Sequence, residues 1–419
     1  MYDAPMRRAL VAGLAAILLG GTDLMSQEWP QFRGPTGQGH AKAKGLPLQW
    51  SETQHVRWKV PVAGVGWSSP VVSSGRVWLT TSVEVPKSPR ERGGLSLRAL
   101  AFDIATAKAV VDVEVFRLTR LRDLNPKNSF ASATPILDGD RVYVHFGADG
   151  TAAISTSGAV LWTARFPYES QHGGGGSPVL YKDLLIFNCD GNSEDAFVVA
   201  LDTRTGKERW RRDRRKPSEQ AYTTPLVITV EGRDQLISVG AYRAGAYDPA
   251  TGREIWRVSY ADGFSNVPRP VFGNGLVFIA TGFQQPTLIA VRPGGEGDVT
   301  RTHVAWTLTR GAPFTPSPIL VGDLLYVVSD TGILTLVDAA TGRVHYQQRL
   351  GGNYSASPVW ADDRIYFLSE EGVATVITPG IAFNRVAVNR LDGSTLASMA
   401  MSDGAIYIRS QTHLYRLGD

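Results

Sequence analysis

The side chains best suited to chemistry in this chain of 419 residues are aromatic and cationic residues that precede a series of short proline-containing phrases. The aromatic residues are Trp67, Phe130, Tyr222, Phe264, Phe314 and Tyr354, and the cationic residues are Lys127, His172, Arg269 and Arg310. Aromatic rings beside cations could bind a peptide strand, a sugar or an anionic small molecule. The alternative is that each ring packs between neighbouring elements of the fold. We interpret all of them except Lys127 as candidate ligand- or partner-binding residues.

Motifs for covalent or metal-assisted catalysis are missing from the sequence. The histidines, at positions 40, 55, 145, 172, 303, 345 and 413, form no HExxH pattern and no close ligand spacing. There is also no GxSxG elbow and no phosphate-binding P-loop. Cys189 is the only cysteine, which excludes an internal disulfide, a CxxC redox pair and a cysteine zinc cage. We therefore expect no catalytic residue, no metal site, and a buried, inert thiol at Cys189.

Charge gives little indication of a partner. The formal net charge is +4, which is small for this length, so we predict no nucleic-acid partner. A basic run at residues 209–216 could meet anionic lipid, polysaccharide or an acidic protein, or it could be an outer strand whose charges discourage edge pairing. His172 and the four glycines after it could bring the backbone close to a ligand or could relieve crowding in a channel.

The elements that must position these residues follow from a repeat. A small residue, a proline and two or more apolar residues recur along the chain as an anchor. The anchor prolines stand at positions 70, 135, 178, 225, 270, 318 and 358, and an eighth copy around Met399 keeps the pattern without proline. Most intervals fit the roughly 40–50 residues of a four-stranded propeller blade. The first interval is longer, and we attribute the excess to a charged loop at residues 83–97.

A second phrase, Asp-x-x-Thr-Gly-Lys/Arg, begins at Asp202, Asp248 and Asp338. Aspartate opens a turn by bonding its own backbone, and glycine supplies a positive φ, so the phrase predicts the turn between the third and fourth strands of a blade. Closing strands often carry tryptophan. We expect the tryptophans at positions 162, 210, 256 and 306 to pack between adjacent blades.

The two ends of the chain are expected to share the last blade. The final repeat contains only three strands, and residues 55–60 look like the closing strands of the other repeats. Pairing them would close the ring and remove two open sheet edges. The predicted fold class is therefore all-β, an eight-bladed β-propeller of four-stranded antiparallel blades closed by an N-terminal strand. It would span residues 55–419 and follow a lead-in segment at residues 27–54.

Residues 1–26 have the order of a secretory signal peptide. Arg7 and Arg8 precede an apolar run at residues 9–19 that is too short to span a membrane, and small and polar residues follow it. No cysteine follows the run, so no lipoprotein anchor is predicted, and no later stretch is long and apolar enough to cross a bilayer. We expect a periplasmic or secreted monomer.

The repeated Asp-x-x-Thr-Gly phrase with its Ser/Thr-Pro anchors resembles the pyrroloquinoline-quinone (PQQ)-like repeat family over about residues 55–419. Residues 29–35 look like the leader of secreted bacterial members. The resemblance implies either a non-catalytic, BamB-like scaffold or a PQQ- and Ca²⁺-dependent dehydrogenase, because the fold hosts both. The adjacent cysteine pair of many such dehydrogenases is impossible here, although some quinoproteins lack it.

Oxygen ligands for calcium could come from acidic and amide residues in the loops that enter each blade. These residues are Asn128, Glu169, Glu219, Asp262 and Asn266, and they could also be ordinary turn formers. We predict an exported scaffold that binds a protein partner or a small ligand of the cell envelope on the channel-mouth face, without cofactor or catalysis. The alternative is a quinoprotein dehydrogenase that oxidises alcohols or sugars with PQQ and Ca²⁺.

Overall fold

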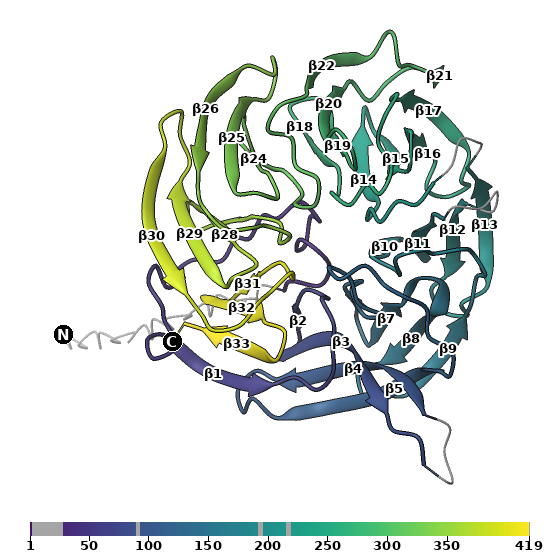
Figure 1. Cartoon of the computed structure of the whole chain (residues 1–419), viewed down its shortest axis with the longest axis vertical. Helices are drawn as coiled ribbons and strands as arrows, with labels where there is room; N and C mark the ends of the chain where they lie inside the picture. The colour runs from purple at the N-terminus through teal and green to yellow at the C-terminus, as the bar shows by residue number, and fades with distance from the viewer. Residues whose placement is uncertain (2–27, 89–92, 192–195, 215–218, 419) are drawn as a thin grey trace.

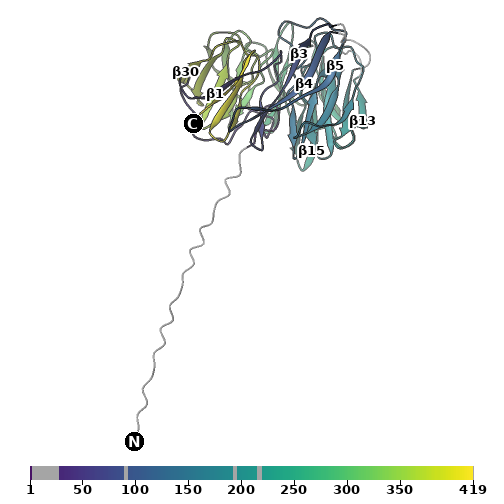
Figure 2. The same ribbon diagram turned by 90° about the horizontal axis from the view of Figure 1, so that it is seen from below.

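Eight β-sheets stand around a central axis and form a closed ring (Figure 1). The computed structural model describes Met1 and residues 28–88, 93–191, 196–214 and 219–418. Seen from the side, the strands run through the thickness of the disc (Figure 2). Each sheet contains four antiparallel strands, and one sheet carries an additional short strand. The predicted all-β propeller of eight blades is confirmed, whereas the predicted signal peptide lies almost wholly outside the described residues.

The first four blades follow the order of the chain, each from its innermost to its outermost strand. They are β2 (Val71–Ser73), β3 (Arg76–Val85), β4 (Gly94–Asp103) and β5 (Ala109–Leu118); β6 (Ile136–Asp138), β7 (Arg141–His145), β8 (Thr151–Ser155) and β9 (Val160–Ala164); β10 (Val179–Tyr181), β11 (Leu184–Cys189), β12 (Phe197–Asp202) and β13 (Glu208–Asp213); and β14 (Leu226–Val230), β15 (Arg233–Val239), β16 (Arg243–Tyr247) and β17 (Glu254–Ser259). A 3₁₀ turn, η1 (Gly147–Asp149), lies between β7 and β8.

The last four blades complete the ring. They are β18 (Val271–Gly273), β19 (Leu276–Thr281), β20 (Thr287–Val291) and β22 (Val304–Leu308); β23 (Ile319–Val321), β24 (Leu324–Val328), β25 (Ile333–Asp338) and β26 (Val344–Arg349); β27 (Val359–Ala361), β28 (Arg364–Leu368), β29 (Val373–Thr378) and β30 (Asn384–Arg390); and β31 (Ala400–Ser402), β32 (Ala405–Arg409) and β33 (His413–Leu417) with β1 (Val56–Pro61). The short strand β21 (Gly297–Asp298) lies beside β17.

The hydrophobic core lies between neighbouring blades. The two middle strands of a blade are buried on both faces, and the outermost strand alternates, as in β13, where only Trp210 is buried. This pattern explains the continuous apolar runs of the middle strands, since a strand covered on both sides has no polar face. No helix among the described residues is long and apolar enough to cross a membrane.

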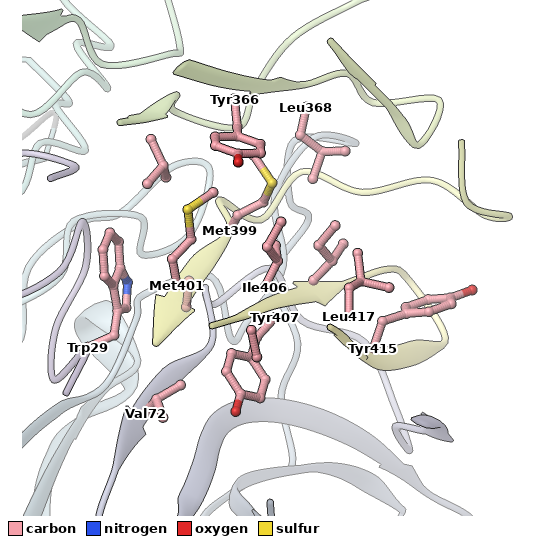
Figure 3. Close-up of a cluster of buried hydrophobic side chains, with 14 of the residues drawn as sticks. Trp29, Val72, Tyr366, Leu368, Met399, Met401, Ile406, Tyr407, Tyr415 and Leu417 are labelled. Atoms are coloured by element: carbon pink, nitrogen blue, oxygen red, sulfur yellow. The ribbon is translucent and has the colours of Figure 1, made fainter. Parts of the chain in front are cut away.

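The eighth blade joins the two ends of the chain, as predicted. Strand β1 pairs antiparallel with β33, with Lys59 opposite Tyr415 and Val60 opposite Leu414. Apolar residues from this blade, its neighbours and the lead-in segment form one buried cluster, in which Trp29 lies near Met401 and Val72 (Figure 3). This closure completes the ring, so each blade packs against another blade on both of its faces.

In several blades a tryptophan of the outermost strand hydrogen-bonds to the following blade. The indole Nε1 of Trp162 donates to the carbonyl of Thr203 in the following blade at 2.9 Å, and the ring covers Gly206. Gly206 has a φ of 69°, which favours glycine, and a Cβ at this position would lie 2.5 Å from the indole. Both the backbone conformation and the close packing therefore require glycine in this turn. Trp210 and Trp306 repeat the arrangement on the turns of the next blades. The predicted packing between blades is confirmed for these residues.

Trp256 is the exception, and the sequence of the fifth blade explains it. Its Nε1 donates to Gln235 Oε1 within its own blade at 2.8 Å. The fifth blade has a longer connection in place of the Asp-x-x-Thr-Gly turn, and β21 of that connection pairs with β17 beside Trp256. The ring still packs between the fourth and fifth blades, but it has no glycine turn to rest on.

The prediction of a charged loop at residues 83–97 is wrong for most of that segment. Strands β3 and β4 continue as a long hairpin, with Val83 opposite Ser96 and Val85 opposite Gly94. The alternation of apolar and polar residues on both sides favours strands, and it outweighs the charges that suggested a loop. Residues 89–92 lie outside the described part of the chain.

Candidate functional site

The lead-in segment at residues 29–41, purple in Figure 1, closes one end of the central channel. It bonds to the innermost strands of several blades, each time at the second residue after the anchor proline. The residues contacted in this way are Val72, Leu137, Phe272, Leu320 and Trp360. Innermost strands would otherwise present unpaired backbone groups to the channel, so the segment supplies partners that the ring lacks.

A belt of hydrogen bonds surrounds the channel at the residue before each anchor proline. In each step the backbone N–H of one blade donates to the hydroxyl of the next blade at 2.9–3.1 Å. The steps run from Ser69 to Thr134, Thr134 to Ser177, Ser177 to Thr224, Arg269 to Ser317, Ser317 to Ser357, Ser357 to Ser398, and Ser398 to Ser69. The Ser/Thr-Pro anchors therefore have a structural cause, since each hydroxyl satisfies a buried N–H of the neighbouring blade.

The belt is interrupted where Arg269 stands in place of serine or threonine. Arg269 offers no hydroxyl to the preceding blade. Its buried guanidinium instead donates from Nε to the carbonyl of Pro225 at 3.0 Å and from Nη1 to the carbonyl of Phe32 at 2.7 Å. Arg269 thus joins the belt to the lead-in segment at the closed end of the channel.

The open end of the channel contains a cavity of about 340 Å³. Phe32 of the lead-in segment and the belt hydroxyls line its base, and both aromatic rings and polar side chains, such as Asn125, Gln220 and Thr315, line its wall. The volume is near the lower end of the range for small-molecule sites. Aromatic rings above a hydroxyl-lined base can hold a ligand with one apolar and one polar end.

The structure brings together several residues singled out from the sequence. Trp67, His172, Tyr222, Phe264 and Phe314 all line the cavity. They come from the connections that lead into five different blades, as expected for segments that converge on one face. The structure thus places more than half of the candidate set around one space.

The other candidates lie elsewhere, each for a physical reason. Phe130 packs beneath the guanidinium of Arg122, which lies 5.2 Å from the ring centre. Tyr354 is buried in the apolar core between the sixth and seventh blades, and Arg269 belongs to the belt. Arg310 is exposed and does not line the cavity. These four side chains precede an anchor, but sequence position alone does not fix where they point.

Phe283 is a rim residue that sequence reasoning missed. Its side chain is 50% exposed, and its ring lies 5.3 Å from that of Phe264 and 6.1 Å from that of Phe314. It stands between β19 and β20. Because antiparallel strands alternate in direction, this connection emerges on the same face as the connection from the previous blade. A search of both kinds of connection would have found it.

The rim and base of the cavity differ in charge. No Asp or Glu occurs in the described lining of the cavity. Lys127 at the rim pairs with Glu370, just outside the lining, at 2.7 Å, and Glu370 also accepts from Ser355 Oγ. The positive charge of the rim is therefore compensated, whereas Arg269 near the base has no carboxylate partner among the described residues.

The structure supports the crowding interpretation of the glycine-rich segment after His172, and the approach of its backbone to a ligand stays a prediction. Gly175 lines the cavity. A Cβ on Gly174 would lie 2.7 Å from the Cα of Gly147, in the neighbouring blade. Glycine at position 174 therefore relieves crowding, while Gly175 lets the backbone form part of the cavity wall.

The candidate calcium ligands do not fit a cage beside a quinone. Asn128 lines the cavity, but its amide bonds to the N–H of Ser129 and the carbonyl of His172. Asn266 is buried and bonds to the backbone of Gly240. Glu169, Glu219 and Asp262 are not among the lining residues. In the part of the chain that the structure describes, no group of three or more His, Cys, Asp or Glu side chains could hold a metal.

The basic run forms the outer strand β13 and is neutralised locally. Arg209 pairs with Asp183 at 2.9 Å and with Asp202 at 3.0 Å. Arg211 pairs with Glu208 at 2.7 Å and lies over the ring of Phe197. Residues 215 and 216 lie outside the described part of the chain. The run therefore presents less free charge than its sequence suggests.

Arg214 ends the described part of this run and turns inward. Its Nε lies 2.6 Å from Asp190 Oδ1, and both side chains are almost fully buried. Burial raises the pKa of Asp190 to about 6, and the guanidinium of Arg214 offsets only part of this shift. Beside it, Cys189 is buried, and burial raises the pKa of its thiol, as expected for an inert cysteine.

Comparison with known proteins places this architecture in context. A family model described as "Outer membrane protein assembly factor BamB" matches residues 41–242 and 240–396. A curated protein of that description from Francisella salina is 26% identical over 232 residues, which cover 53% of this chain and 41% of the relative. The alignment thus spans less than half of that relative.

Solved structures agree at the level of the fold. BamB from Moraxella catarrhalis superposes with a TM-score of 0.57 at 12% identity and covers 86% of this chain and 97% of its own. The computationally designed Ika8 protein superposes with a TM-score of 0.60, also at 12% identity, over 90% of this chain and all of its own. At such identities the likeness concerns the backbone fold alone.

Proposed function

The chain belongs to the family described as outer membrane protein assembly factor BamB, and from this premise we propose that it is an exported scaffold that binds a protein partner in the cell envelope. The proposed binding surface is the channel-mouth face. The proposed partner is a component of outer-membrane protein assembly, in keeping with the description of the family. The role needs no catalysis, because a rigid ring that gathers loops on one face suffices for binding.

One observation carries the choice of surface. Phe264, Phe283 and Phe314 form a continuous aromatic cluster at the rim, and Phe283 is half exposed to solvent. Large aromatic side chains beside a desolvated pocket are typical of the residues that dominate binding energy. The outer strand β13, by contrast, holds its charges in local pairs.

Site-specific photo-crosslinking tests this surface. A benzophenone side chain replaces Phe283 in one variant and Val388 in a matched variant, since Val388 is 54% exposed on the outer strand β30. We expect the variant at position 283 to give a discrete adduct in cell envelopes, identified by mass spectrometry as an outer-membrane assembly protein. Equal or stronger labelling from position 388 would contradict the proposed surface.

The dehydrogenase alternative is tested separately. The cavity lining described above has no carboxylate to hold calcium beside a quinone. We expect the purified protein, incubated with PQQ and Ca²⁺, to show no dye-linked oxidation of alcohols or sugars. Saturable quinone binding with turnover would reverse the order of the two functions.

A further inference from the structure

The base of the mouth cavity is rich in hydrogen-bond donors. Each belt hydroxyl accepts a hydrogen bond from a backbone N–H of the neighbouring blade. Among the described contacts none of these hydroxyls donates a hydrogen bond, so its own hydrogen remains available to a ligand. A hydroxyl carries one donor hydrogen and two acceptor lone pairs, and the belt consumes one of the lone pairs. A ligand at the base therefore meets a ring of donors.

Buried cations lie behind residues of this base, and none of them lines the cavity itself. Arg33, Arg269 and Arg409 are at most 2% exposed, and none of them forms an ion pair within the described residues. Arg269 bonds to Phe32 at the base of the cavity, and Arg33 follows Phe32 in the chain. Arg409 Nη1 donates to Ser68 Oγ at 2.8 Å, next to Ser69 of the belt.

The positive charges of these guanidinium groups are not balanced by a carboxylate among the described residues. The pKa of each guanidinium is lowered to about 9, by burial for Arg269 and Arg409, and by burial together with the nearby charge of Arg269 for Arg33. All three remain protonated at neutral pH. Nε and Nη1 of Arg33, and Nε and Nη2 of Arg409, are buried without a hydrogen-bond partner. A buried charge without a counter-ion is costly, so an anion close by would recover part of that cost.

Aromatic rings form part of the wall above the base. Trp67, Tyr222, Phe264 and Phe314 line the cavity over the base formed by Phe32 and the belt. Rings of this kind favour stacked or edge-on contact with another ring. The cavity of about 340 Å³ is large enough for a small molecule but small for a folded partner.

We propose that the base of the mouth cavity binds a small aryl anion, with its phosphate or carboxylate group on the belt and its ring between the aromatic side chains. This site goes beyond the proposed protein scaffold, because it concerns a small molecule and a different part of the mouth. Donor hydroxyls fix the anionic group, the buried guanidinium groups behind the base supply a favourable field, and the aromatic side chains contact the ring of the ligand. Charge-assisted hydrogen bonds in such surroundings are stronger than neutral ones.

Isothermal titration calorimetry with three probes tests the class of ligand. Phenyl phosphate combines ring and charge, benzyl alcohol keeps the ring alone, and inorganic phosphate keeps the charge alone. We expect phenyl phosphate to bind at least about tenfold more tightly than either of the others, which corresponds to about 1.4 kcal/mol. Equal affinities of phenyl phosphate and benzyl alcohol would overturn the proposal.

A charge-removing variant locates the site. Arg269→Ser removes one guanidinium and supplies the hydroxyl that the belt lacks at this step, so the ring is expected to remain folded by thermal melting. We expect phenyl phosphate to bind about tenfold more weakly to this variant, with benzyl alcohol unchanged. Arg310→Ser removes an exposed charge outside the cavity and serves as the matched control.

A second variant keeps the test decisive if Arg269→Ser melts early. Arg33→Gln removes the charge and keeps a polar side chain with N–H donors, while the bonds from Nη2 to the carbonyls of Pro318 and Gln38 are lost. The same weakening of phenyl phosphate binding is expected. Unchanged binding in a folded Arg269→Ser or Arg33→Gln variant, or the same loss in Arg310→Ser, would overturn the site. Crosslinking at Phe283 reports on the protein partner independently of these titrations.

Discussion

Two arginine-rich regions of this molecule have opposite electrostatic character. The outer strand β13 carries its arginines next to one another in the sequence, yet Arg209 and Arg211 pair with neighbouring carboxylates. Arg33, Arg269 and Arg409 come from distant parts of the chain and are buried beside the lead-in segment or the belt, and no carboxylate pairs with them among the described residues. Arg209 and Arg211 of the run have carboxylate partners, whereas the dispersed arginines have none among the described residues.

This difference shows that local charge density in a sequence is a poor guide to electrostatic function. A run of like charges on an outer strand recruits counter-ions from the next strand and the adjacent turn, because these are within reach of long side chains. The arginines buried near the channel have backbone and hydroxyl partners instead. Their field persists, since few mobile ions enter a dry interior to screen it.

The largest expected effect comes from breaking a pair in the compensated region. Asp190→Ala removes the counter-ion of Arg214, whose side chain is only 3% exposed. We expect the free energy of unfolding to fall by about 3–5 kcal/mol, since an uncompensated charge is left buried. Urea denaturation followed by circular dichroism measures the change. A shift below about 1 kcal/mol would mean that Arg214 finds another partner or water.

A smaller loss of stability is expected from the belt. Thr224→Ala removes the acceptor for the N–H of Ser177, which is then left unsatisfied in a buried position. The expected cost is about 1–3 kcal/mol, again by urea denaturation. Thr224→Ser keeps the hydroxyl and should be close to the natural protein. Equal losses in both variants would show that the methyl group, and not the hydrogen bond, matters.

The comparison also predicts which region captures a protein partner. Tyr222→Ala combined with Phe314→Ala should lower the adduct yield from a benzophenone at position 283 several-fold, because the aromatic rim is lost. Arg211→Glu combined with Arg212→Glu should lower it less, with folding of both variants checked by melting. The opposite order in folded proteins would make β13 the working surface.

The smallest effect is expected at the exposed end of the basic run. Asp183→Ala removes one partner of Arg209, whose second partner, Asp202, remains. Because both side chains of the lost pair are largely exposed, we expect no measurable shift in the denaturation midpoint. A clear destabilisation would show that the outer pairs act as a coupled network.

Much of the fold was predictable because it follows from a short-range period. The spacing of the anchor prolines predicts the number of blades, and the incomplete last repeat predicts the pairing of β1 with β33. The tight turns were also predictable, since Asp202 Oδ1 accepts the N–H of Thr205 as the local sequence indicates. Periodic features of this kind depend on residues close together in the chain.

The site was predictable only in part, because its contacts are long-range and aperiodic. The connections before the anchors indicated five of the cavity residues, but Phe283 stands in an irregular connection outside that pattern. The closing role of residues 29–41 rests largely on backbone carbonyls and N–H groups, which leave no signature in side-chain pattern. Arg269 was visible as a cation, but its direction was set by Phe32, more than 200 residues away.

The shared eighth blade also sets a time order for folding. Strand β1 leaves the ribosome, or any export channel, long before its partner β33 at residues 413–417. Until that last strand emerges, the seven completed blades form an open arc whose terminal strands can pair with other chains. The interval of exposure grows with every residue between β1 and β33, so the speed of chain delivery governs how long the ring is vulnerable to aggregation.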